Sequence, residues 1–131
     1  IIVHIFETKP IAILYKNKDK YILDSSSNLI PFKDDLSFEN LPSVFGESAE
    51  KKFVTFFNIF NENKFPNAKI KNFFYFQIGR WDLELSDGKT IKFPEKNTIY
   101  AIKKSIDLLN HKDFEKYNII DFRVDGKIIV E

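Results

Sequence analysis

Short apolar runs separated by turn-forming residues fill the first third of the chain. β-Branched and aromatic residues favour strands, and Pro10, between two such runs, marks a bend or the edge of a sheet. Polar turn residues follow at Asn17–Lys20 and Asp24–Asn28, so each strand is short. The predicted strands are Ile1–Glu7, Ile11–Tyr15, Tyr21–Leu23 and Leu29–Phe32. Their spacing predicts an antiparallel meander.

Two later segments change to the period of an α-helix. The first, Ser48–Asn63, begins at a serine that can serve as N-cap, and the second, Asn97–Leu109, begins at an asparagine that can do the same. The apolar stripes expected to face a core are Ala49, Phe53, Phe56, Phe57 and Phe60 in the first segment and Ile99, Ile102, Ile106 and Leu109 in the second. Charged residues fall on the opposite side of the second segment, so both segments predict amphipathic helices.

Alternation between positions 81 and 93 determines the register of a predicted β-hairpin. Odd positions from 81 to 85 are apolar, even positions are polar, and an Asp-Gly turn follows. A two-residue loop would place Leu83 opposite Lys92 and divide the apolar set between two faces. A three-residue loop, with its glycine in the left-handed region, instead pairs Leu83 with Ile91 and Trp81 with Phe93. These four apolar residues are therefore predicted to share one buried face.

The end of the chain, Ile119–Glu131, predicts a second hairpin around another Asp-Gly turn. An odd-length loop aligns Ile120 with Val130 and Phe122 with Ile128, and these four residues then point inward. The outward face holds Asp121, Arg123, Lys127 and Ile129. Because Ile129 is apolar, the last strand is apolar on both faces, which an exposed sheet edge normally avoids. We therefore expect this strand to be covered.

The chain is long enough for one domain with a sizeable core. Of its 131 residues, 44% are hydrophobic and 16% are aromatic, which argues against a disordered chain. Twenty Lys and Arg against nineteen Asp and Glu leave a net charge of +1, so overall charge indicates neither nucleic acid nor an anionic membrane surface as a partner. We expect one α+β domain over residues 1–131, with a curved, largely antiparallel sheet and two main amphipathic helices.

Residue types that form catalytic and cofactor sites are sparse. The chain has no cysteine, which excludes disulfides, thiolate metal sites and thiol nucleophiles. His4 and His111 have no second ligand at metal-binding spacing, and Asp34-Asp35 is more typical of a solvated loop than of paired catalytic carboxylates. Glycine-rich phosphate loops, nucleophile elbows and zinc-protease helices are absent from the sequence. We therefore expect no enzymatic activity, no metal and no cofactor.

An aromatic run keeps a second function open. Phe73–Phe76 lies among lysines, and strands that bind RNA or single-stranded nucleic acid combine basic and aromatic residues in this way. The glycine pattern of such strands is missing, and adjacent aromatic side chains point to opposite faces of a strand. The sequence favours a core strand here, with nucleic-acid binding as the alternative function.

Four motifs follow one another along the chain. They are Phe6-Glu7-Thr8-Lys9-Pro10-Ile11-Ala12, Leu41-Pro42-Ser43-Val44-Phe45-Gly46, Arg80-Trp81-Asp82-Leu83-Glu84-Leu85-Ser86-Asp87-Gly88-Lys89-Thr90-Ile91 and Asp121-Phe122-Arg123. In this order they resemble the β domain of the FtsQ/DivIB family of bacterial cell-division proteins, particularly its alphaproteobacterial members. The resemblance covers nearly the whole chain. The chain departs from the family pattern at Gly79, often arginine, at Phe122, usually leucine, and after Asp24, where serines replace a glycine.

The resemblance implies a non-enzymatic scaffold of the divisome at the septum, on the periplasmic face of the inner membrane. It implies FtsB-like and FtsL-like partners, a role in controlling septal peptidoglycan synthesis, and a transmembrane helix and POTRA domain upstream of this chain. Together with the apolar last strand, it predicts strand addition at the C-terminal edge. The expected partner-binding residues are Arg123, Val124, Asp125, Gly126, Lys127 and Ile129, whereas Phe122 and Ile128 are expected to support the fold.

Overall fold

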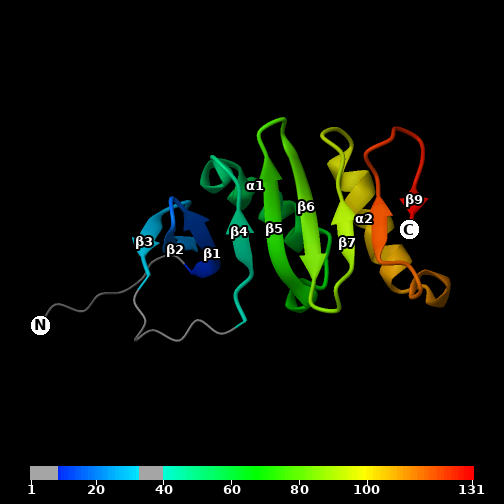
Figure 1. The fold of residues 1–131 in the computed structure, drawn as a ribbon, viewed down its shortest axis with the longest axis horizontal. Helices are drawn as coiled ribbons and strands as arrows, with labels where there is room; N and C mark the ends of the chain where they lie inside the picture. The colour runs from blue at the N-terminus through cyan, green and yellow to red at the C-terminus, as the bar shows by residue number, and fades with distance from the viewer. Residues whose placement is uncertain (1–8, 33–39) are drawn as a thin grey trace, which may run out of the picture.

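The computed structural model describes residues 9–32 and 40–131, which form one mixed sheet with two helices on one of its faces (Figure 1). Within these residues the sheet has nine strands in the order β3-β2-β1-β4-β5-β6-β7-β8-β9. The strands are β1 Pro10–Lys16, β2 Asp19–Asp24, β3 Leu29–Pro31, β4 Ser43–Phe45, β5 Ile70–Phe76, β6 Arg80–Leu85, β7 Thr90–Lys92, β8 Ile119–Asp121 and β9 Ile129–Val130. The helices are α1 Ala49–Glu62 and α2 Thr98–Leu109, and short 3-10 turns lie at Asn67–Lys69 and Lys112–Phe114.

The strand directions explain why both helices lie on the same face. The neighbouring strands β4 and β5 are parallel, as are β7 and β8, and a helix connects each of these pairs. Such crossovers are almost always right-handed. Since β4 and β7 run the same way and both connections step in the same direction across the sheet, α1 and α2 cover the same face. The β1–β4 pair is also parallel and the other five pairs are antiparallel, so the predicted α+β, largely antiparallel fold is confirmed.

The predicted meander forms strands β1 to β3. Asn17 and Lys18, both with positive φ, connect β1 to β2 in a two-residue turn. The serine-rich turn that follows is organised by Asp24, whose Oδ1 accepts hydrogen bonds from the backbone N–H groups of Ser26 and Asn28 at 2.9 and 2.8 Å. This carboxylate stabilises the turn without the glycine typical of the family. The predicted strand Ile1–Glu7 lies outside the described residues.

The hairpin of β6 and β7 has the three-residue loop that its alternation predicts. Asp82 lies opposite Lys92 and Leu83 opposite Ile91, and the Phe93 N–H donates to the Trp81 carbonyl at 3.0 Å. Gly88 has φ +93°, the left-handed conformation that the loop needs. Trp81, Leu83, Ile91 and Phe93 are all buried beneath the helices.

Both helices begin where the sequence indicates, but the expected side-chain capping hydrogen bonds are not formed. Ser48 and Asn97 occupy the N-cap positions in the left-handed conformation, and neither side chain forms a capping hydrogen bond. N-cap side chains reach the first turn from the β region, and the positive φ of these two residues prevents that geometry.

The predicted stripe of α2 is displaced at its start. Ile99 is 52% exposed, whereas Ala101, Ile102, Ser105 and Leu108 form the buried side. The small side chains of Ala101 and Ser105 lie on this buried side, and Ile99 points toward solvent. The buried Ser105 hydroxyl donates to the Ile102 carbonyl at 2.7 Å, so its polarity is satisfied.

Aromatic residues dominate the core between α1 and the sheet. The members of this cluster are Phe53, Phe56 and Phe60 from α1 and Phe73, Trp81 and Phe93 from the sheet side. Phe122 is also buried, and Ile128 is half-buried against the same core. Aromatic pairs add interaction energy beyond the area they bury, so this cluster holds α1 to the middle of the sheet.

Candidate protein-binding edge

β9 is the last strand of the sheet, with β8 as its only neighbour among the described residues. Ile119 and Glu131 exchange two backbone hydrogen bonds, at 3.1 and 3.0 Å. In an antiparallel ladder, hydrogen-bonded pairs alternate with pairs that are not bonded to each other. Val130 lies between the bonded pair Ile119–Glu131 and the next bonded pair, so its N–H and C=O point away from β8. The described part of the chain thus presents a backbone donor and acceptor at this edge.

The side chains of β9 alternate between the two faces of the sheet. Val130 and its neighbour Ile128 pack toward the core, whereas Ile129 lies opposite Asp121 on the face away from the helices. Ile129 is 39% exposed and is not covered by α1 or α2. The edge therefore combines free backbone groups with an exposed aliphatic side chain.

A cavity of about 460 Å³ lies next to this edge, between the β8–β9 connection and the start of α2. The connection contributes Phe122 through Ile128, and the facing wall contains Pro94, Glu95, Lys96, Asn97, Tyr100 and Ala101. Five of the six predicted partner-binding residues, Arg123 through Lys127, line this cavity, and Ile129 does not. The predicted partner-binding residues therefore lie in two places, five around the cavity and Ile129 on the exposed strand β9.

The facing wall of this cavity was not predicted. Tyr100 lines it and is 61% exposed. The sequence does contain a signal, because an aromatic residue at position 100 lies off the apolar stripe of its helix. The position of Tyr100 across the cavity from the β8–β9 connection could not be predicted from the sequence, since it depends on where the crossover places α2.

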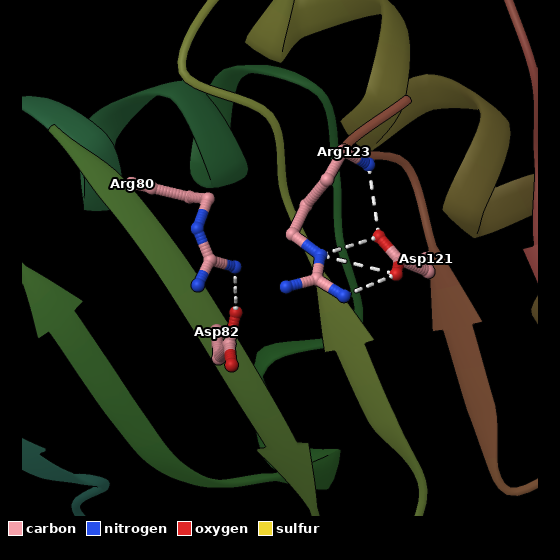
Figure 2. A network of polar contacts seen from close by, with 4 residues as sticks. All are labelled: Arg80, Asp82, Asp121 and Arg123. Carbon is pink, nitrogen blue, oxygen red and sulfur yellow. Dashed lines mark hydrogen bonds and ion pairs between the residues drawn. The ribbon is translucent and has the colours of Figure 1, made fainter. Parts of the chain in front are cut away.

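The β8–β9 connection is stabilised at its tip and at its start. At its tip, the Lys127 N–H donates to the Val124 carbonyl at 3.1 Å, and Gly126 has positive φ, as a tight turn requires. At its start, Figure 2 shows Arg123 folded back onto Asp121, with Nε and Nη2 donating to the carboxylate at 2.9, 3.0 and 2.7 Å. The Arg123 backbone N–H also donates to Oδ1, at 2.9 Å.

This ion pair changes the titration of both of its partners. The hydrogen bonds from Arg123 lower the pKa of Asp121, and Asp121 in turn raises the pKa of Arg123. Much of the Arg123 guanidinium is therefore occupied within the chain. A partner carboxylate can reach only its remaining donors, whereas Lys127 forms no ion pair among the described residues.

A second ion pair lies two strands further into the same face. Arg80 Nη1 donates to Asp82 Oδ1 at 2.6 Å (Figure 2). The Arg80 guanidinium also covers the Phe76 ring at 4.5 Å. Burial raises the pKa of Asp82, while the nearby positive charges of Arg80, Lys92 and Arg123 act in the opposite direction. Asp82, Lys92 and Asp121 are cross-strand neighbours, so charges of alternating sign extend toward the edge.

The aromatic run on β5 does not form a stacking platform. Phe73 is fully buried, and Tyr75 packs on Trp81 with ring centroids 4.8 Å apart. On the other face, Phe74 stacks against Phe45 at 5.3 Å, and Arg80 covers Phe76. Nucleic-acid bases stack on free ring faces. Of these four rings only Phe76 is exposed, at 39%, and Arg80 covers its ring.

Other chemistry considered from the sequence adds no site. His4 and Asp34-Asp35 lie outside the described residues, and the exposed His111 is 3.7 Å from the Asp113 carboxylate. Within residues 9–32 and 40–131, His, Asp and Glu side chains do not gather in groups of three that could hold a metal ion. In the same part of the chain, neither helix is long and apolar enough to cross a bilayer.

Comparison with known proteins agrees with this architecture. Residues 12–123 match the family model described as cell division protein FtsQ/DivIB, C-terminal. The chain is 34% identical to cell division protein FtsQ of Rickettsia bellii over 100% of its own length and 49% of the relative. It is 25% identical to FtsQ of Rhizobium meliloti over 95% of its length and 41% of the relative. The chain thus spans about half the length of these relatives.

A solved structure has the same fold. The major extracytoplasmic domain of the cell division protein DivIB from Geobacillus stearothermophilus superposes with a TM-score of 0.51 at 14% identity, over 82% of this chain and 91% of that one. With most of its length matched by the family model and the fold matched by a DivIB domain, the chain belongs to the FtsQ/DivIB family of bacterial cell-division proteins, as a C-terminal domain of that family.

Proposed function

We propose that the chain is a non-enzymatic scaffold domain of the divisome that binds an FtsB-like partner, together with an FtsL-like one, by strand addition to β9. The observation that carries this proposal is the outward-facing backbone of Val130 beside the exposed Ile129. A strand added here would gain backbone hydrogen bonds for affinity and use alternate side chains for specificity. The family membership makes division proteins the natural class of partner.

The surroundings of β9 suit a partner longer than one strand. The cavity beside the β8–β9 connection adjoins the edge and can accept a side chain that flanks the added strand. Lys96 and Lys127 at this cavity favour acidic partner residues, which would raise the association rate more than the affinity. Glu95 and Asp125 also line it, so the arrangement of charges provides specificity rather than general attraction to acids.

The cellular setting of this proposal follows from the family resemblance. We place the domain on the periplasmic face of the bacterial inner membrane, at the septum, where partner binding would help control septal peptidoglycan synthesis. A transmembrane helix and a POTRA domain would belong to the remainder of the longer protein. No cofactor or metal enters this function.

The replacement Ile129→Glu tests the surface part of the proposal. A charge at this exposed position should abolish binding of the FtsB-like partner from the same organism and leave the melting temperature within about 2 °C of the parent. Ile78→Glu is the matched control, because Ile78 is 67% exposed in the turn between β5 and β6 and should bind normally. If Ile129→Glu binds like the parent, or unfolds the domain, β9 is not the proposed surface.

The backbone part of the proposal is tested at Val130. Val130→Pro removes an outward N–H without removing a bond to β8, and Val130→Ala shortens the side chain while keeping that N–H. Calorimetric titration should detect partner binding to the alanine variant and none to the proline variant. Equal binding by the two variants would contradict strand addition.

A further inference from the structure

A second cavity lies on the helix side of the sheet, away from β9. It has a volume of about 350 Å³ and is bordered by α1, by the β5–β6 hairpin and by the start of α2. Its lining includes Lys51, Lys52, Phe56, Ile59, Tyr75 and Trp81. Pro94, just before α2, lines both cavities, so this hollow adjoins the one beside the β8–β9 connection.

Three aromatic residues form an apolar base for this cavity. Phe56 and Trp81 are buried and stacked, with ring planes 5° apart and centroids 5.0 Å apart. Tyr75 also packs on Trp81, with its ring centroid 4.8 Å from that of Trp81. Rings held in this way form a rigid surface, which suits an inserted aromatic or aliphatic side chain.

Positive charge borders the cavity on the α1 side. Lys51 and Lys52 are exposed and form no ion pair among the described residues. Glu50, next to them in α1, is paired with Lys16 at 2.9 Å and also attracts Lys51, which leaves the border with a net positive charge. No carboxylate is among the residues that line the cavity, although Glu95 lies beside Gly79 at the opposite border.

Beyond the cavity, the side of α2 that carries Thr98 packs into the core. Ile102 and Ile106, four and eight residues after Thr98, share its side of the helix, with Ile102 buried and Ile106 half-buried. Ile99 adjoins them at the first turn and is 52% exposed. Because Ile99 directly follows Thr98 of the cavity border, exposed apolar surface continues onto the first turn of α2.

We propose that the cavity between α1 and α2 is a second docking site, which binds an acidic segment of another protein through one aromatic anchor. The anchor would rest against the half-buried Ile59 and Tyr75, beside the buried Trp81, and its neighbouring carboxylates would lie beside Lys51 and Lys52. Charge complementarity selects an acidic segment, because the free charges on the α1 border are positive. The residues that line this cavity do not include any of β9 or of the β8–β9 connection, so this site is distinct from the β9 edge.

Trp81 provides a direct measurement, since it is the only tryptophan in the chain. Its single indole N–H signal in a nitrogen–proton NMR spectrum should shift saturably when the peptide acetyl-Asp-Glu-Phe amide is added. The peptides acetyl-Lys-Lys-Phe amide and acetyl-Asp-Glu-Ala amide should cause no saturable shift, because the first has the wrong charge and the second has no anchor.

Charge reversal on α1 tests the role of the lysines. Lys51→Glu with Lys52→Glu should weaken the binding of acetyl-Asp-Glu-Phe amide about tenfold, since each exposed ion pair contributes a factor of about two to five. Acidic residues in a first helical turn are favourable, so this variant should fold. Lys112→Glu with Lys116→Glu makes the same change of net charge beyond the other end of α2 and should bind like the parent.

Several results would overturn the proposal. The indole signal of Trp81 could stay unshifted with acetyl-Asp-Glu-Phe amide, shift equally with the lysine peptide, or respond identically in the variant with reversed Lys51 and Lys52. A shift that depends on protein concentration without any peptide would identify a second copy of the chain as the occupant and also overturn it.

Discussion

Trp81 lies flat against Phe56, with ring planes 5° apart and centroids 5.0 Å apart. The stack connects β6 to α1 and is surrounded by the rings of Phe53, Phe73 and Tyr75. Trp81 is 4% exposed, so its contribution to the core is large while one side still borders a cavity.

We predict that Trp81→Ala lowers the free energy of unfolding by about 3 to 5 kcal/mol, the usual range for emptying a large aromatic position. Urea denaturation followed by circular dichroism measures this change. A loss below about 1 kcal/mol would contradict the central position of the indole in the core.

Gly46 should be the least replaceable glycine of the fold. It has φ +122°, and a Cβ at this position would collide with the Tyr75 carbonyl oxygen. Gly46→Ala should lower the free energy of unfolding by about 2 to 4 kcal/mol, from backbone strain and the clash together. Gly88→Ala is the matched control, since Gly88 also has positive φ but open space around it, and should cost about 1 kcal/mol. Equal losses in the two variants would contradict the close approach of Gly46 to the Tyr75 carbonyl.

The Arg123–Asp121 pair should make stability depend on acid pH. Arg123 lowers the pKa of Asp121 in the folded state, so the pair stabilises the fold above the unfolded value of about 3.9. This stabilisation is lost as pH falls through the lower folded pKa. Because Arg123 is partly exposed, we expect at most about 1 kcal/mol.

The variant Arg123→Met tests this pH dependence. The difference in unfolding free energy between parent and variant should be constant from pH 7 to pH 5 and shrink below about pH 4. A difference that grows with acidification would have the wrong sign for a depressed carboxyl pKa. A Lys92→Met variant serves as a comparison, because it removes another positive charge from the same face and its unfolding free energy can be measured over the same pH range.

Local alternation made the β-hairpins readable from the sequence. Leu83 and Ile91 can share a buried face in only one register, so the loop length followed from the side chains alone. The same reasoning aligns Ile120 with Val130, and the ladder of β8 and β9 contains this pair. The predicted alignment of Phe122 with Ile128 is wrong as a ladder pair, because β8 ends at Asp121, β9 begins at Ile129, and the segment between them borders the cavity.

Features that depend on the placement of whole elements were not readable. Ile99 fits an apolar stripe by spacing, but Ala101 and Ser105 lie on the buried side of α2 and Ile99 points outward. The cavity walls at Tyr100 and Lys52 arise from the positions of two crossover helices. An off-stripe aromatic residue such as Tyr100 can be noticed in the sequence, but the sequence contains no local signal for where the helices lie. The N-cap residues show the same limit, since a serine or asparagine at a helix start does not determine its own φ.

Amide hydrogen exchange at Val130 tests strand addition most directly. In the free chain the Val130 N–H points away from β8 and should exchange rapidly, whereas the Ile119 N–H, bonded to the Glu131 carbonyl at 3.1 Å, is a protected internal reference. On addition of an FtsB-like partner, we predict that exchange at Val130 slows at least about tenfold, because its N–H joins a new ladder. A partner that binds while Val130 continues to exchange at its free rate would contradict strand addition at β9.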